Sequence, residues 1–417
     1  MAMPIAYHRW TGLVMSSRRE KFGLWMVGVG GRVSATVAVG VSALKRGLTA
    51  TCGMVTELPA LADHDLPEPG SLVIGGHEVR SQTITESIRE MHELSGLIDS
   101  ELIRRCSGDV HKIEANVRLG TLYGASKAIR SLVGRDRATE PTRPGDVVKR
   151  LTADLEEFQH QHRLDHVVVV NVSSSEPPFR IGPTQRTFES IRRSLGKSGS
   201  RVLPASALYA LAAIEAGCSY INFTPSLGIA APGLEARAAQ RGTLYAGRDG
   251  KTGETLVKSI LAPMFAMRNL QVLSWVGHNI LGNRDGAVLS DPKSRASKIK
   301  SKDQTIPAIV GYQPDIHTSI EYIRSLDDWK VAWDFIHFQG FLGTKMNMQF
   351  TWQASDSILA APLIIDLVRL TVLAWRRRET GPMKHLACFF KQPMHVGEHD
   401  YVTQWRQLVA HVNSDGG

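Results

Sequence analysis

The sequence predicts an α/β fold with a doubly wound parallel sheet, from a strand, glycine turn and helix near its start and from a later alternation of strands and helices. In the first pattern, an apolar segment at residues 24–27 leads into a glycine turn and then into a helical segment rich in Ala and Val. Glycines let a phosphate approach the backbone N–H groups at the start of a helix. Gly28, Val29, Gly30 and Gly31 are therefore candidate contacts for the diphosphate of a dinucleotide, and a simple packing turn is the alternative.

The alternation continues through the first half of the chain. A valine run at residues 167–170 is typical of a buried parallel strand. The elements expected after the glycine turn are, in order, a linker at 58–71, a strand at 72–74, a helical region at 81–132, an exposed loop at 134–145, a helix at 147–162, a strand at 166–171, a helix at 205–216 and a strand that ends within 220–225. This order favours a Rossmann-like domain.

Polar residues follow two of the expected strands. Glu78 follows the strand at 72–74, where an acid can bind a ribose hydroxyl and favour NAD over NADP because it would repel a 2′-phosphate. A solvated loop acid is the alternative for Glu78. Ser174 lies in a run of serines after the strand at 166–171.

Composition and charge indicate a soluble globular protein with room for two or three cores: the chain has 417 residues, of which 43% are hydrophobic and 21% charged. A formal net charge of +9 suits anionic ligands such as sugar phosphates and dinucleotides. The cations are scattered and no known nucleic-acid-binding pattern accompanies them, so no nucleic acid is expected as a partner. The four cysteines form no C-x-x-C pair, which predicts neither a zinc site nor a disulfide framework and fits a reducing cytoplasm.

Two segments imitate signals for export or membrane insertion. The arginine pair at residues 18–19 precedes an apolar run, as in a twin-arginine signal, but cleavage after that run would remove the glycine turn. Residues 358–375 are apolar enough to suggest a membrane span, but Pro362, Asp366 and Arg369 interrupt them. We therefore expect a buried helix there, no membrane and a cytoplasmic protein.

The second half of the chain carries the residues expected to do chemistry. Lys251, Thr252, Gly253 and Thr255 precede a helix expected to start near residue 256, which is a suitable phosphate pocket.

Residues 282–302 then hold Asp285 and four lysines. Lys298 and Lys302 would project from one helix face and repel each other unless an anion lies between them, and a solvated basic helix is the alternative.

Together with the segments around Lys330, Asp356 and Lys391, these blocks form an ordered set that resembles the myo-inositol-phosphate synthase family. The blocks read GVGGRVSAT, GRDGKTGETLVKS, GNRDGAVLS followed by SKIKSK, DDWKVAWD, SDSILAAPLIIDL and FFKQP. The resemblance covers most of the chain. It implies a Rossmann-like NAD-binding domain at residues 1–262, an inserted α+β catalytic and tetramerisation domain at 263–362, and a C-terminal segment at 363–417 that completes the first domain.

The resemblance further implies an NAD-dependent isomerase that cyclises glucose 6-phosphate to 1L-myo-inositol 1-phosphate. The steps would be oxidation, enolisation, intramolecular aldol closure and reduction. The middle steps put negative charge on oxygen, which an ammonium group stabilises, and crowded lysines lower one another's pKa. The implied roles are proton transfer and oxyanion stabilisation for Lys298 and Lys330, phosphate binding for Lys302, stabilisation of the closing alkoxide for Lys391, and orientation of lysines and substrate for Asp285 and Asp356.

The resemblance also implies cofactor contacts for Ser174, Asp249, Asn283 and Asp356, and a substrate contact for Asn283. It implies assembly into a homotetramer. No metal-ligand cluster is visible in the sequence, although members of the family differ in whether a cation assists.

Some positions depart from the family pattern, among them Arg284, Ile280 and Glu254. A carboxylate at position 254 would repel phosphate unless it points away or pairs with a lysine. These substitutions motivate the alternative of a paralogue that cyclises another sugar phosphate, such as fructose 6-phosphate. A non-catalytic protein that binds NAD or sugar phosphate is a further alternative. The last residues, 411–417, are expected to form an unstructured tail.

Overall fold

The first half of the chain folds around a seven-stranded sheet in which every paired strand is parallel. The computed structural model describes residues 20–125, 129–130, 133, 141–282, 286 and 305–414. In sheet order the strands are β11 (Gly381–Pro382), β6 (Leu244–Gly247), β5 (Ser219–Asn222), β4 (His166–Asn171), β1 (Phe22–Val27), β2 (Val73–Glu78) and β3 (Val117–Leu119). Because the chain runs outward in both directions from β1 and β4, the sheet is doubly wound, as predicted.

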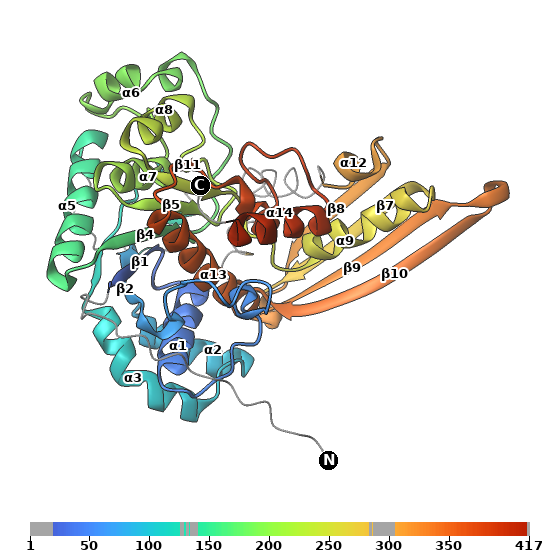
Figure 1. The fold of residues 1–417 in the computed structure, drawn as a ribbon, viewed down its shortest axis with the longest axis horizontal. Helices are drawn as coiled ribbons and strands as arrows, with labels where there is room; N and C mark the ends of the chain where they lie inside the picture. Colours follow the sequence, from blue (N-terminus) through green and yellow to red (C-terminus); the bar gives the residue numbers. More distant parts are fainter. Residues whose placement is uncertain are drawn as a thin grey trace.

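Helices cover both faces of this sheet (Figure 1). The helices of this part are α1 (Arg32–Lys45), α2 (Ile84–Ser95), α3 (Ser100–Glu114), α5 (Pro144–His162), α6 (Phe188–Leu195), α7 (Ala205–Glu215), α8 (Pro232–Arg241), α13 (Asp356–Arg376) and α14 (Tyr401–Asn413). Alternate strand residues point to opposite faces. Leu24 and Met26 of β1 accordingly pack with α1 and α13, whereas Trp25 and Val27 pack with α5 and α7.

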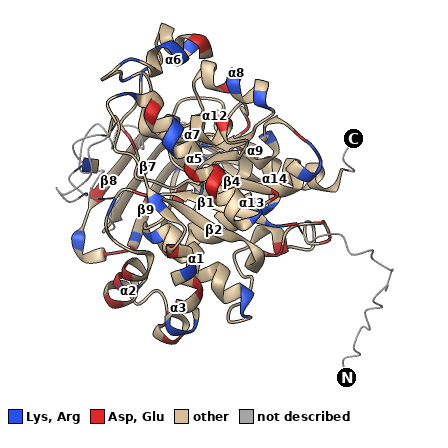
Figure 2. Cartoon of the chain, turned by 90° about the vertical axis from the view of Figure 1, so that its left-hand side faces the viewer, with Lys and Arg blue, Asp and Glu red and all other residues tan. Residues whose placement is uncertain are grey.

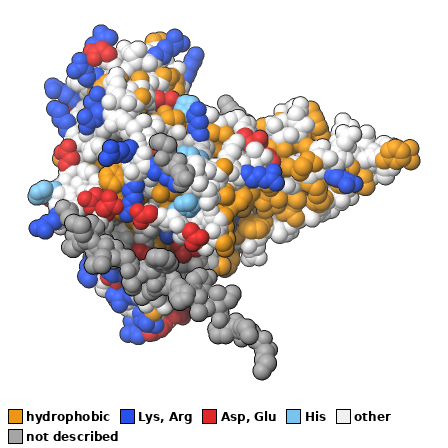
Figure 3. All heavy atoms as spheres, viewed as in Figure 1, with side chains coloured by type: hydrophobic (Ala, Val, Ile, Leu, Met, Phe, Trp, Pro, Cys, Tyr) orange, Lys and Arg blue, Asp and Glu red, His pale blue; other side chains and the backbone are white. Residues whose placement is uncertain are grey.

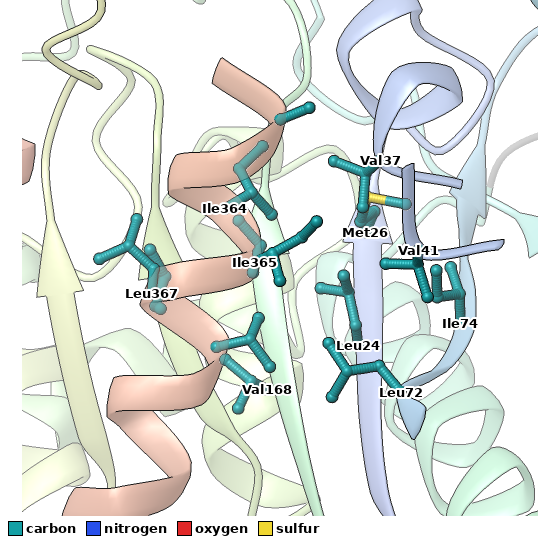
Figure 4. Close-up of a cluster of buried hydrophobic side chains, with 14 of the residues drawn as sticks. Leu24, Met26, Val37, Val41, Leu72, Ile74, Val168, Ile364, Ile365 and Leu367 are labelled. Carbon is teal, nitrogen blue, oxygen red and sulfur yellow. The ribbon is translucent and has the colours of Figure 1, made fainter. Parts of the chain in front are cut away.

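The buried helix predicted at residues 358–375 is α13, which returns the chain from a second sheet to the first. It is long and apolar enough to cross a membrane, alone among the described helices, but most of it is buried in the core. Ile364 and Ile365 lie on the side of α13 that faces β1 and α1, whereas Leu367 projects from the opposite side, and all three belong to one buried cluster (Figure 4). The prediction of a core helix is confirmed.

The second sheet has four strands, in the order β10 (Lys345–Ser355), β9 (Trp329–Gln339), β7 (Gln271–Leu281) and β8 (Asp315–Tyr322). It extends away from the first sheet as an arm (Figure 1). The helices α9 (Glu254–Met267) and α12 (Thr305–Val310) cover one of its faces. All four strands lie between residues 263 and 362, and the three-segment domain division stays a prediction.

A buried group of charges attaches α9 to this second sheet. Lys258 Nζ lies 2.6 Å from a Glu254 oxygen and 3.4 Å from Asp334 Oδ1, and Trp275 Nε1 donates to the same Asp334 oxygen at 2.7 Å. Burial alone would lower the pKa of Lys258, but the two carboxylates outweigh it and raise that pKa. The expected conflict between Glu254 and a phosphate is therefore resolved, because Glu254 pairs with a lysine.

Two expectations were wrong. The region at 81–132, predicted as helical, contains the strand β3 between α3 and α5; β3 has three residues with an arginine at its centre, too few to establish an alternating pattern. The tail predicted at 411–417 begins inside α14, which continues to Asn413 because Leu408 and Val412 are buried on one face. On the surface, α3 and α6 each carry both acidic and basic residues (Figure 2).

The buried carboxyl group of Asp366 in α13 gives a prediction about stability and pH. It accepts hydrogen bonds from the backbone N–H groups of Val55 and Thr56, and burial raises its pKa to about 6. An unfolded Asp has a pKa of about 3.9. The folded state therefore binds more protons between pH 4 and 6, so this group's contribution to stability is present below pH 4 and is lost as pH rises to 6, by about 3 kcal/mol at most.

Asp366→Asn should abolish this dependence. The free energy of unfolding of variant and wild type is measured by urea unfolding at pH 4 and at pH 7. The difference, variant minus wild type, should be about 2 to 3 kcal/mol more positive at pH 7 than at pH 4. The control is Asp63→Asn, which changes an exposed Asp in the segment between α1 and β2. An equal pH dependence in the wild type and in Asp366→Asn would contradict the prediction.

Candidate active site

A cleft of about 270 Å³ lies at the carboxyl ends of β1, β2, β4, β5 and β6, the edge at which parallel α/β sheets bind ligands. Residues that follow these strands line it, together with residues at the starts of β9 and α13. It therefore forms where the first sheet meets the base of the second. Of the predicted site residues, those that line it are Gly28, Gly31, Glu78, Ser174, Asp249, Thr252, Lys330, Asp356 and Lys391.

The glycine turn is shaped for close approach of a ligand. Gly28 has φ +89°, and a Cβ there would lie 3.1 Å from the backbone of Ser173. The N–H groups of Gly28 and Val29 both donate to the His77 carbonyl. No side chain caps α1, and the first N–H groups of that helix, from Arg32 to Ser34, donate to no acceptor in the described part of the chain. This uncapped N-terminus fits the diphosphate of a dinucleotide.

Glu78 supports this turn from the end of β2. One carboxylate oxygen accepts from Gly30 N at 2.8 Å, and the other accepts from Val79 N and Arg80 N at 2.8 and 2.9 Å. A Cβ on Gly30 would lie 2.7 Å from Glu78. The carboxylate therefore fixes the turn, and its expected contact with a ribose stays a prediction.

The serine run after β4 forms the opposite wall. Ser174 lines the cleft, and the following Glu176 is buried. Glu176 accepts hydrogen bonds from the backbone N–H and hydroxyl of Ser206 at the start of α7. Burial raises the pKa of Glu176.

Lys391 and Asp249 form one of the two lysine and aspartate pairs that the described residues place in the cleft. Their side chains lie 3.0 Å apart, and Lys391 N donates to the Asp249 carbonyl at 2.7 Å. Asp249 N in turn donates to Thr224 O, which fixes this segment beside the end of β5. Both side chains are less than a tenth exposed, so water screens their charges poorly.

Lys330 and Asp356 form the second pair. Lys330 Nζ lies 3.4 and 3.3 Å from the two Asp356 oxygens, and the Thr252 hydroxyl donates to Asp356 at 3.4 Å. Asp356 is the first residue of α13, but Ser355 caps that helix by accepting from Ile358 N. The Asp356 carboxylate thus lies in the cleft, in contact with Lys330 and Thr252, and does not cap the helix.

Three residues of the predicted phosphate pocket, Lys251, Gly253 and Thr255, are buried beside the cleft and do not line it. Lys251 Nζ donates to Gln404 of α14 at 2.8 Å. Burial lowers the pKa of Lys251 to about 8, and the nearby Lys391 lowers it further while other neighbours oppose this. The Thr255 hydroxyl is buried and has no hydrogen-bond partner among the described residues.

Four predicted site residues lie outside the described residues: Asn283, Asp285, Lys298 and Lys302.

Several residues that line the cleft were not predicted as site residues, among them Arg32 and Asp328. Arg32 Nη1 lies 3.4 Å from Asp328 Oδ1 and Nη2 lies 3.3 Å from Glu90 Oε1. Its buried Nε has no partner in the part of the chain that the structure describes. Asp328 also accepts from the hydroxyls of Ser355 and Ser357. Two features of the sequence could have pointed to these residues: Arg32 directly follows the glycine turn, and Asp328 lies two residues before Lys330.

One group of potential metal ligands was found among the described residues, outside the cleft: Glu379, His385 and His411. The two imidazole rings stack with centroids 3.6 Å apart and planes 7° from parallel. One ion cannot lie in both ring planes at this separation, so this arrangement would have to change before both rings could bind it. We assign no metal to it.

Comparisons with known proteins agree with the fold. The family profile described as myo-inositol-1-phosphate synthase, with an NAD-binding designation, matches residues 22–413. Inositol-3-phosphate synthase 1 of Bacteroides thetaiotaomicron is 30% identical over 416 residues, covering 93% of this chain and 94% of that protein. The inositol-3-phosphate synthase of Saccharomyces cerevisiae is 26% identical over 89% of this chain and 77% of its own length.

Solved structures share the fold. Inositol-3-phosphate synthase of Caenorhabditis elegans matches with a TM-score of 0.83 at 22% identity, covering 95% of this chain and 86% of that one. A myo-inositol-1-phosphate synthase-related protein of Thermotoga maritima matches with a TM-score of 0.74 at 22% identity, covering 94% and 98%. With a profile match over nearly the whole chain and a relative at 30% identity, the chain belongs to the myo-inositol-1-phosphate synthase family and is an NAD-dependent isomerase.

Proposed function

We propose that this enzyme cyclises glucose 6-phosphate to 1L-myo-inositol 1-phosphate by oxidation, enolisation, intramolecular aldol closure and reduction. The observation that carries the proposal is that two lysine and aspartate pairs, Lys330 with Asp356 and Lys391 with Asp249, share one cleft with an uncapped glycine turn. A cofactor at the turn and ammonium groups in the same cleft are what this sequence of steps needs.

The cofactor would be held by the glycine turn and the walls next to it. Gly28, Val29, Gly30 and Gly31 would admit the diphosphate to the start of α1, with Ser174 and Asp249 on the opposite side. Asn283, outside the described residues, is proposed as a further contact. When bound, NAD would accept a hydride from the substrate and return it at the end, so that no NADH accumulates.

Lys330 is proposed as the group that moves a proton and stabilises the first oxyanion. Its Nζ is held by Asp356, which Thr252 also contacts, so the ammonium has a fixed position before substrate arrives. An ammonium fixed in this way donates to a developing enolate oxygen without reorganising. Lys391, held by Asp249, would serve the closing alkoxide in the same manner.

The phosphate is proposed to lie near Thr252 and Lys251. Lys302, Lys298 and Asp285, outside the described residues, are expected to complete this end of the site.

Fructose 6-phosphate was the alternative substrate. In the described part of the chain, neither Glu254 nor Ile280 lines the cleft, so neither of these substitutions supports that alternative.

Assembly into a homotetramer through the second sheet is also proposed. On the sheet face opposite α9, Trp333 is 37% exposed and stacks on His278. At the tip of the arm Phe341 and Leu342 are 88% and 86% exposed. Hydrophobic side chains gather along this arm (Figure 3), as expected of a surface that another copy covers.

Lys330→Met should lower the turnover of glucose 6-phosphate about 100-fold or more, because it removes the proposed proton carrier and oxyanion donor together. The affinity for NAD, measured by calorimetry, should change little because the glycine turn is untouched. Lys345→Met, at an exposed lysine of the same sheet, is the control and should retain wild-type turnover. Turnover of Lys330→Met within tenfold of wild type would contradict the proposed role.

Light scattering after size-exclusion chromatography should give about four times the chain mass of 45.8 kDa. Trp333→Asp should yield smaller species, because a charge on the outer sheet face would have to be buried in the interface. A wild-type monomer at all concentrations, or a tetramer unaffected by Trp333→Asp, would contradict assembly through this face.

A further inference from the structure

Arg80 places a guanidinium in the cleft at the end of β2, where dinucleotide-binding sheets distinguish NAD from NADP. Its side chain is 15% exposed and lines the cleft. Nε and Nη2 lie 3.2 and 3.1 Å from the two Glu78 oxygens, and Nη1 donates to Gln82 Oε1 at 3.1 Å. Arg80 is therefore held beside Glu78 in a fixed, two-pronged contact.

This contact changes what Glu78 can do. An acid at the end of the second strand favours NAD because its charge repels a 2′-phosphate. The Glu78 carboxylate accepts from three backbone N–H groups, those of Gly30, Val79 and Arg80, and also from the Arg80 guanidinium. Its charge is compensated by a neighbouring cation and by several donors, so its repulsion of a phosphate is reduced.

Arg80 also retains donors for a ligand. A guanidinium has five N–H groups. Three of them have acceptors in the described part of the chain, two on Glu78 and one on Gln82. One N–H on each terminal nitrogen remains, and such a pair matches the oxygens of a phosphate.

Among the residues that the structure describes, Glu90 is the other acid at this end of the cleft, and it too has partners. Gln82 Nε2 donates to Glu90 at 2.9 Å, and Arg32 pairs with the same carboxylate at 3.3 Å. The rim thus carries Arg80 beside Glu78 and Arg32 beside Glu90, each acid facing an arginine.

We propose that the cleft contains a subsite for a 2′-phosphate, in which Arg80 is the specificity-determining residue, so that the enzyme binds NADP as well as NAD. The inference rests on the cofactor site proposed above, and the expectation that Glu78 favours NAD over NADP stays a prediction that the same titrations test. Arg80 offsets the acid and supplies charge-assisted hydrogen bonds to the added phosphate.

The test is calorimetric titration of the full chain with NAD and, separately, NADP. The wild-type dissociation constants should lie within about tenfold of each other. Arg80→Ser should weaken NADP binding about 10- to 100-fold, the loss expected for hydrogen bonds to a charged group, and change NAD binding little. Arg80→Lys should recover part of the NADP affinity. Arg89→Ser, at an exposed arginine of α2, is the matched control and should leave both affinities unchanged.

Three results would overturn the inference. If wild type binds NAD but binds NADP more than about 100-fold more weakly, the 2′-phosphate subsite is wrong and the proposed function stands. If Arg80→Ser weakens NAD and NADP equally, with its melting temperature preserved, Arg80 only supports the turn. If the wild type binds neither dinucleotide, both the subsite and the cofactor site are wrong.

Discussion

The active-site cleft depends on the contact between Arg32 and Asp328, which joins the glycine turn to the second sheet. Asp328 is fully buried, and besides Arg32 it binds the hydroxyls of Ser355 and Ser357, which flank Asp356. Lys330 follows Asp328 by two residues. A single carboxylate therefore sets the positions of both members of the Lys330 and Asp356 pair relative to the start of α1. Burial raises the pKa of Asp328, although Arg32 and the two serines oppose that shift.

Pairing of opposite charges is the second constraint, because the cleft and its surroundings hold ammonium groups where water is scarce. Lys330, Lys391 and Lys258 each face a carboxylate, which offsets the free-energy cost of burying the charge. Lys251 has an amide partner instead, and its pKa falls to about 8. The same rule extends to the cofactor end, where arginines face Glu78 and Glu90. Charge compensation thus keeps the cleft stable while leaving donors for anionic ligands.

Much of the fold could be predicted because its signals are local. The strand β4 spans residues 166–171, as its valine run predicted. The helix α13 was predicted from its apolar run with polar interruptions. The ordered motifs predicted that Lys330, Asp356 and Lys391 belong to one site, and all three line the same cleft. The contacts of Arg32 and Lys251 could not be predicted: Arg32 and Asp328 are 296 residues apart, and Lys251 and Gln404 are 153 apart, so no local pattern records either contact.

The central claim is that this cleft cyclises glucose 6-phosphate with NAD regenerated. It is tested most directly by incubating the purified chain with NAD and carbon-13-labelled glucose 6-phosphate, and separately with labelled fructose 6-phosphate, and following both by phosphorus and carbon NMR. The account predicts an inositol monophosphate from glucose 6-phosphate without accumulation of NADH. A carbocycle from fructose 6-phosphate alone, or no carbocycle from either sugar despite bound NAD, would contradict it.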